Sequence, residues 1–156
     1  MYNILEVVMK IIIVNGPNLN MLGKREPDKY GKKSLNYIEK ILLDKAKKFK
    51  VDLIFFQSNH EGEIIDFIQK EGAKADGMLI NPGAYTHTSI AIRDAILSVN
   101  IPFVEVHITN IYKREKFRRR SYFKDISIGQ IVGFGIYGYV LAFYGIINFL
   151  KKNGKV

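Results

Sequence analysis

Hydrophobic residues along this chain gather in five short runs, each followed by a polar turn and then by a longer segment with wider apolar spacing. The runs are rich in β-branched and aromatic residues, which is typical of buried strands. They occupy residues 11–14, 51–56, 77–80, 101–108 and 129–135. Between them, apolar residues recur at helical spacing, as they do over residues 35–49.

Strand and helix therefore alternate along the whole chain, which predicts an α/β fold. Parallel strands need crossover connections, so we expect a five-stranded parallel sheet with helices on both faces. The commonest order for such a sheet is 2-1-3-4-5, the flavodoxin-like arrangement. In that order the turns after strands 1, 3 and 4 bring Asn18, Asn81 and His107 to one crevice at the carboxyl edge.

Polar residues and a glycine mark the expected helix ends. Ser34 is the predicted N-cap of the first long helix, and Asn59 is the predicted N-cap of the second. Gly72 ends the second helix, and either Thr88 or Ser89 caps the third.

Residues 130–150 carry no charge, and 21 residues would suffice for a membrane span. Four glycines within the stretch, with Gln130 and Asn148 near its ends, favour instead a buried strand and one apolar helix. A helix that is apolar all round predicts burial against other copies of the chain as well as in its own core. We therefore expect a homo-oligomer without membrane contact, and membrane anchoring is kept as an alternative.

A single domain is expected over residues 9–156, preceded by an N-terminal extension over residues 1–8. The extension contains Glu6 and lacks the basic start of a signal peptide. The chain has no cysteine, which excludes disulfides and thiolate nucleophiles and fits a cytoplasmic location.

The formal net charge of +9 suggests an anionic partner. Most of the lysines and arginines outside the candidate functional segments, however, lie on Lys-rich helical faces such as that over residues 40–50, where solvation explains them. No zinc-finger spacing, helix-turn-helix or RNA-binding signature is present, so no specific nucleic acid is expected. A basic nucleic-acid-binding module is the alternative function. Metal and nucleotide motifs are also missing, which predicts no cofactor.

The fourth strand ends in Glu105-Val106-His107. Alternation along a strand places Glu105 and His107 on the same face, so the carboxylate can orient the imidazole and favour its protonated form. Such a histidine can act as a general acid near neutral pH. The alternative is a purely structural pair.

Three further segments can contribute to a site at the same edge of the sheet. The loop after the first strand holds Arg25 and Tyr30 and can form a lid over the crevice. His87 stands at a helix start, where hydroxyls or anions bind. The basic stripe over residues 113–120 can supply an arginine to a polar ligand.

Five blocks in this order resemble type II 3-dehydroquinate dehydratase, a cofactor-free enzyme of the shikimate pathway. They read NGPNLNMLGKREPDKYG, SNHEGE, NPGAYTHTSIAIRDA, EVHITN and FRRRSYF. The likeness extends from Lys10 to about Leu150. It implies dehydration of 3-dehydroquinate to 3-dehydroshikimate by anti elimination through an enolate.

The resemblance also implies catalytic roles for individual residues. Tyr30 is the base that removes a proton from the carbon next to the ketone, and Arg25 stabilises the tyrosinate. Asn18 holds a water against the enolate oxygen. His107 protonates the departing hydroxyl, with Glu105 beside it.

Substrate contacts and assembly follow from the same resemblance. Asn81, His87 and Arg118 match contacts to substrate hydroxyls, and the backbone N–H groups of Ile108 and Thr109 match the carboxylate site. Asp94 matches an aspartate that reaches the site of a neighbouring subunit. The implied assembly is a dodecamer built as a tetramer of trimers, in the cytoplasm and without a metal.

A tyrosine base makes a physical demand on the loop that carries it. Lowering a tyrosine pKa from about 10 to about 7 requires roughly 4 kcal/mol of differential stabilisation. One exposed arginine supplies less than this, so closure of the loop and exclusion of water must contribute. We therefore expect residues 24–33 to be mobile without ligand.

Overall fold

The structure is a computed structural model that describes residues 8–24, 26–30 and 32–155, apart from the side chains of Lys29 and Tyr30. Its centre is a sheet of five parallel strands in the order β2-β1-β3-β4-β5. The strands are β1 (Met9–Asn15), β2 (Val51–Gln57), β3 (Gly77–Asn81), β4 (Phe103–His107) and β5 (Gly129–Val132). The predicted fold class and strand order are confirmed.

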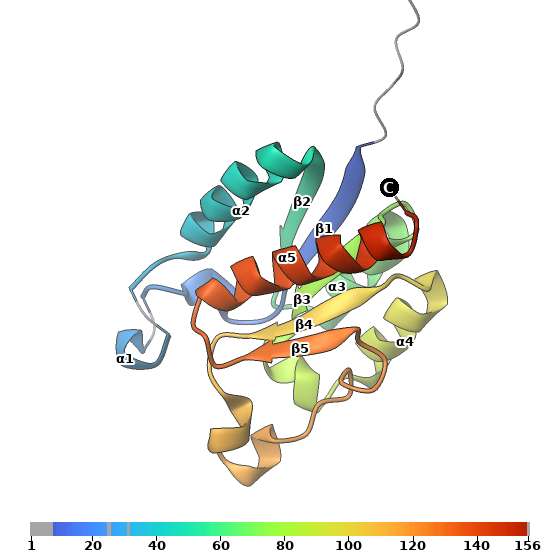
Figure 1. The fold of residues 1–156 in the computed structure, drawn as a ribbon. Coiled ribbons are helices and arrows are strands. Elements are labelled where there is room, and N and C mark those ends of the chain that lie inside the picture. The colour runs from blue at the N-terminus through green and yellow to red at the C-terminus, as the bar shows by residue number, and fades with distance from the viewer. Residues whose placement is uncertain (1–7, 25, 31, 156) are drawn as a thin grey trace, which may run out of the picture.

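Helices cover both faces of this sheet (Figure 1). They are α1 (Pro27–Tyr30), α2 (Leu35–Phe49), α3 (Glu61–Phe67), α4 (Ile90–Val99) and α5 (Tyr137–Lys152). On one face α2 and α5 pack over Ile11 and Ile13, and on the other α3 and α4 pack over Ile12 and Val14. Successive residues of β1 thus enter opposite cores, which explains why its run is apolar without alternation.

Two of the three predicted helix N-caps are confirmed, and the third is wrong. Ser34 and Ser89 each accept a hydrogen bond from a backbone N–H in the first turn of α2 and α4. The prediction that Asn59 caps α3 is wrong, because His60 is the N-cap and the Asn59 side chain bonds to the loop after β1. A π-helical turn over Ile68–Gly72 extends α3 to the predicted glycine.

The uncharged stretch forms β5 and α5, as the glycines suggested. Within the described residues, no helix is both long and apolar enough to cross a membrane. Helix α5 buries Phe143 and Ile146 against the sheet and exposes Tyr137 and Tyr144 on its outer side.

One side chain of α5 reaches the carboxyl ends of two strands. The Tyr139 hydroxyl donates to Asn15 Oδ1 (2.6 Å) in β1 and accepts from Asn81 Nδ2 (3.0 Å) in β3. Burial raises the pKa of Tyr139 far above its ordinary value, so the hydroxyl remains a neutral donor. The first bond holds the Tyr139 hydroxyl in place, and the second holds the side chain of Asn81.

Replacing Tyr139 by Phe should lower the free energy of unfolding by about 1–3 kcal/mol, because two buried amides lose their partner. Urea denaturation of both proteins measures the difference. Tyr144→Phe, on the exposed side of the same helix, is the control and should change stability by less than about 0.5 kcal/mol. Equal losses in the two variants would contradict a stabilising role for the Tyr139 hydroxyl.

Candidate active site

A pocket of about 150 Å³ opens at the carboxyl edge of the sheet, between the loops that follow β1, β3 and β4. This volume suits a small organic molecule. The predicted site residues that line it are Asn18, Asn81, His87, His107, Ile108, Thr109 and Arg118. The predicted convergence of Asn18, Asn81 and His107 is therefore confirmed.

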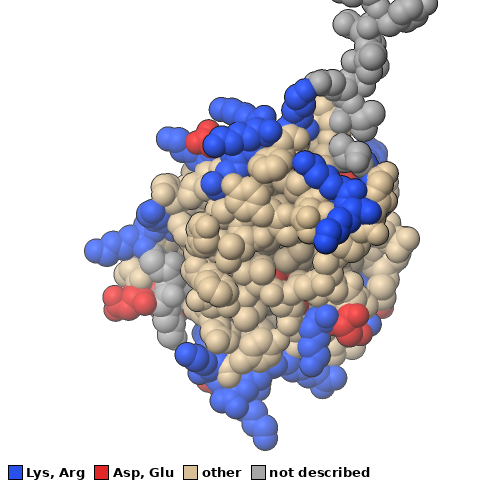
Figure 2. Space-filling view, viewed as in Figure 1, with Lys and Arg blue, Asp and Glu red and all other residues tan. Residues whose placement is uncertain are grey.

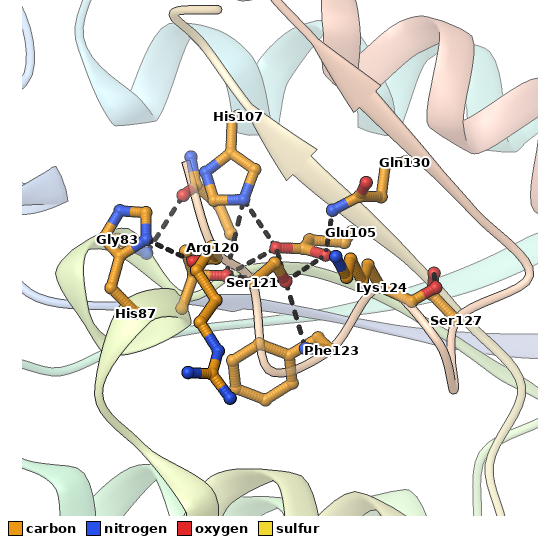
Figure 3. Close-up of polar contacts among 12 residues, drawn as sticks. Gly83, His87, Glu105, His107, Arg120, Ser121, Phe123, Lys124, Ser127 and Gln130 are labelled. Carbon is orange, nitrogen blue, oxygen red and sulfur yellow. Dashed lines mark hydrogen bonds and ion pairs between the residues drawn. The ribbon is translucent and has the colours of Figure 1, made fainter. Parts of the chain in front are cut away.

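Beneath the pocket, Glu105 and His107 form a hydrogen-bonded pair (Figure 3). His107 Nε2 lies 2.7 Å from Glu105 Oε1, and the Glu105 side chain is 0% exposed. The expectation that strand alternation places the two on one face is confirmed. Because Nε2 faces the carboxylate, Nδ1 lies on the opposite side of the ring.

Three further side chains donate hydrogen bonds to Glu105. Thr86 Oγ1 lies 2.5 Å from Oε1, and Gln130 Nε2 lies 2.6 Å from Oε2. Ser121 Oγ lies 2.8 and 2.9 Å from the two carboxylate oxygens. Burial by itself would raise the pKa of Glu105 and is the largest single influence, but the bonds from His107, Thr86 and Ser121 together hold this pKa below its ordinary value.

The carboxylate of Glu105 is therefore ionised at neutral pH. It accepts a hydrogen bond from Nε2 of His107, which fixes the orientation of the ring. A histidine held in this way at the floor of a pocket can give a proton to a leaving group. The arrangement supports the predicted general acid.

Sequence reasoning missed the donors to Glu105. Thr86 and Ser121 lie within the quoted blocks, and Gln130 stood out only as a polar residue in an uncharged stretch. Thr86 lies 19 residues before Glu105, whereas Ser121 lies 16 residues and Gln130 lies 25 residues after it. Only the folded sheet brings them together, and the one available signal was an acid within an apolar strand, which requires donors.

His87 lies at the rim of the same pocket. Its Nδ1 is 2.6 Å from the carbonyl oxygen of Arg120, so Nδ1 carries the proton and donates it. Burial lowers the pKa of His87, and the hydrogen bond to that carbonyl opposes this effect only partly. The ring is thus neutral at pH 7, and Nε2 can accept a hydrogen bond from a ligand hydroxyl.

The Asn81 side chain is fixed by its neighbours. Oδ1 accepts from the backbone N–H of Gly83 (3.1 Å), and Nδ2 donates to Tyr139 (3.0 Å). One N–H of the amide remains for a ligand, since Nδ2 carries two hydrogens. Asn81 therefore faces the pocket as a donor.

Two arginines of the basic stripe line the pocket, Arg114 and Arg118. Arg118 Nε lies 3.1 Å from Glu115 Oε2, which holds the guanidinium in place. The sequence predicted that the stripe supplies one arginine, Arg118, to the site. The structure adds Arg114 to the residues that line the pocket. The Arg120 guanidinium lies over the Tyr122 ring, and this residue contributes its carbonyl group instead.

Two predicted site residues are not placed by the described part of the structure, and a third does not line the pocket. Arg25 lies outside the described residues, and so does the side chain of Tyr30, whose backbone ends α1. Asp94 is exposed on α4 and is not among the residues that line the pocket. The roles of these three residues and the mobility of residues 24–33 stay predictions.

The described residues contain no group of three or more His, Cys, Asp or Glu side chains placed to hold a metal ion. The polar groups that line the pocket are imidazoles, amides, arginines and the hydroxyl of Thr109.

Comparison with known proteins places these residues in a family. The profile of dehydroquinase class II matches residues 9–147. A curated 3-dehydroquinate dehydratase from Prochlorococcus marinus subsp. pastoris is 57% identical over 145 residues, which is 93% of this chain and 99% of that protein. One from Francisella tularensis subsp. novicida is 51% identical over 147 residues, or 94% of this chain and 100% of the relative.

A solved structure agrees with the sequence relatives. The type II dehydroquinase from Butyrivibrio crossotus superposes with a TM-score of 0.86 at 46% identity, covering 90% of this chain and 98% of that one. The residues matched by the family profile, 9–147, include all five strands and all the residues that line the pocket.

The ionised state of Glu105 predicts a pH dependence of stability. Its pKa is lower in the folded chain than the ordinary value of 4.5, so as the pH falls below that value the unfolded chain takes up a proton that the folded chain does not. The free energy of unfolding should therefore decrease on acidification, by up to about 1.4 kcal/mol per pH unit for one proton.

Urea denaturation between about pH 3 and about pH 7 measures this slope in the unsubstituted chain and in Glu105→Gln. The variant lacks the titrating group. We therefore expect its free energy of unfolding to change less with pH, by up to about 1.4 kcal/mol per pH unit, which corresponds to one proton. Identical slopes would mean that Glu105 is not held ionised by the fold.

Proposed function

Because this chain belongs to the class II dehydroquinase family, we propose that the pocket at the carboxyl edge of its sheet removes water from 3-dehydroquinate. The activity is that of a 3-dehydroquinate dehydratase, a hydro-lyase of the shikimate pathway whose product is 3-dehydroshikimate.

The single observation that carries the mechanism is the hydrogen bond between His107 and the buried Glu105 (2.7 Å) at the floor of the pocket. Elimination of a hydroxyl needs a proton for the leaving oxygen. His107 supplies it from Nδ1, and Glu105 holds the ring in position through its hydrogen bond to Nε2. Glu105 is thus a positioning residue, since it lies under the histidine and does not line the pocket.

The other half of the reaction removes a proton from the carbon next to the ketone. Tyr30 takes this proton as the tyrosinate, and the resulting enolate then expels the hydroxyl as water. Arg25 supports the tyrosinate by its positive charge. Asn18 lines the pocket at the loop after β1, where its amide can hold a water against the enolate oxygen.

Substrate binding uses the remaining polar groups of the pocket. Neutral His87 accepts from one substrate hydroxyl, and Asn81 donates to another through its remaining N–H. The backbone N–H groups of Ile108 and Thr109 bind the substrate carboxylate. Arg118 contacts a further substrate hydroxyl, and Arg114 adds positive charge to the pocket.

Assembly and location complete the proposal. We assign the chain to a cytoplasmic homo-oligomer, a dodecamer built from trimers, that works without metal or cofactor. Figure 2 shows a broad uncharged area on the α5 face with lysines and arginines around its edge. Phe134 and Tyr137 are 62% and 58% exposed, so this face offers apolar surface to another copy. Asp94 would then serve the site of a neighbouring subunit.

The direct test mixes purified protein with 3-dehydroquinate and a chelator, and follows the conjugated enone by ultraviolet absorbance. Turnover should persist in the presence of the chelator. Tyr30→Phe keeps the ring but removes the ionisable oxygen, so turnover should fall by at least about 10²-fold. Activity near that of the unsubstituted chain in Tyr30→Phe would exclude this residue as the base.

A pair of histidine variants separates the acid from a bystander. His107→Ala should lower turnover by about 10²-fold or more, because the leaving hydroxyl loses its proton donor. His60→Ala, at the exposed start of α3, is the control and should retain turnover. If both variants keep full activity, another group protonates the leaving hydroxyl.

A further inference from the structure

The S-N-H-E-G-E block after β2 has no part in the reaction described above, yet it contacts the loop after β1. Asn59 Oδ1 in this block accepts from the backbone N–H of Asn18 (3.0 Å). Gln57 Nε2 lies 3.2 Å from the same oxygen and 3.2 Å from the carbonyl oxygen of Gly16. Two side chains from the end of β2 therefore hold both sides of the Gly16–Asn18 turn.

The turn that they hold has a backbone conformation that needs support. Asn18 has φ +67° and ψ −2°, in the left-handed region. A non-glycine residue there costs about 1 kcal/mol or more, although asparagine tolerates it better than most. In this conformation the backbone N–H of Asn18 donates to Asn59 Oδ1, and this hydrogen bond offsets the cost of the left-handed backbone.

The backbone on the other side of the turn is equally fixed. Gly16 N–H donates to the carbonyl oxygen of Asn81 (2.8 Å). A Cβ atom on Gly16 would lie 2.3 Å from the Pro82 oxygen, so the loops after β1 and β3 are in direct contact there. Asn59 reinforces that contact, because its own carbonyl oxygen accepts from Tyr85 Oη (2.8 Å) in the loop after β3.

Asn59 is neither a helix cap nor part of the pocket lining. The N-cap of α3 is His60, whose backbone N–H is satisfied by Ser58 Oγ (2.9 Å). Asn59 is also exposed, so its removal leaves little buried surface unpacked. Its side-chain contacts point to the Asn18 turn and not to the stability of α3.

We propose that Asn59 is a positioning residue for the dehydration, which acts by holding the Asn18 backbone so that the Asn18 amide can hold a water against the enolate oxygen. The proposal rests on the function proposed above, in which Asn18 stabilises the enolate. The contact requires only an acceptor oxygen at position 59. Aspartate therefore replaces asparagine in this role, and alanine does not.

Turnover of 3-dehydroquinate by three variants tests the proposal. Asn59→Ala should lower kcat about 10-fold with a smaller change in KM, because Asn18 acts on the intermediate and not on the bound substrate. Asn59→Asp should keep kcat within about 2-fold of the unsubstituted chain. Asn36→Ala, which removes an exposed asparagine from α2, should leave both constants unchanged. An Asn59→Asp variant as slow as Asn59→Ala would overturn the proposal.

A double-mutant cycle identifies the residue through which Asn59 acts. Asn18→Gly removes the amide but suits the left-handed backbone. In the Asn18→Gly background, Asn59→Ala should cause no further loss of kcat. An undiminished 10-fold loss in that background would show that Asn59 acts by another route and would overturn the inference, while the roles of Asn18 and His107 would stand.

Failure of the proposed function gives a different result. If Asn18→Gly alone retains full kcat, the assignment of the enolate contact to Asn18 is wrong, and the inference falls with it. Hydrogen exchange of the Asn18 amide tests the contact without turnover. Asn59→Ala should accelerate this exchange and Asn59→Asp should not, and an unchanged rate in Asn59→Ala would contradict the holding contact itself.

Discussion

The buried carboxylate of Glu105 is the constraint on which the rest of the site depends. A charge removed from water is stable only where donors surround it. The donors come from separate parts of the chain: Thr86 after β3, His107 on β4, Ser121 in the loop that leads to β5, and Gln130 on β5. Satisfying this one carboxylate fixes the positions of those segments around the pocket, and its hydrogen bond to Nε2 orients the imidazole of His107.

Hydrogen bonds between the loops at the carboxyl edge of the sheet are the second constraint on the site. In a parallel sheet the loops after neighbouring strands lie side by side, and here they are bonded to one another through Gly16 and Asn81, and through Asn59 and Asn18. Tyr139 of α5 adds a bond beneath them. The pocket groups are thus held before substrate arrives, which is what electrostatic stabilisation of an enolate requires.

Features that depend on local periodicity could be predicted from the sequence. Features that depend on contacts between segments distant in the sequence could not. Alternating strands and helices gave the sheet order, and strand alternation paired Glu105 with His107. The donors to Glu105 were missed because no local pattern marks a hydroxyl that the fold brings beneath a strand. Asparagine is a common helix N-cap, so Asn59 was predicted to cap α3. Its side chain instead accepts a hydrogen bond from a backbone N–H in the turn after β1. The roles of Tyr30 and Arg25 rest on the resemblance and the family.

The central claim is that ionised Glu105 holds His107 with its Nε2 proton directed to the carboxylate, so that Nδ1 serves the substrate. Nitrogen-15 NMR of the histidine rings, with His107→Ala used to assign the signal, measures this directly. The account predicts that His107 Nε2 carries a proton at neutral pH and that this proton exchanges slowly with solvent. An Nε2 without a proton at neutral pH would contradict the account.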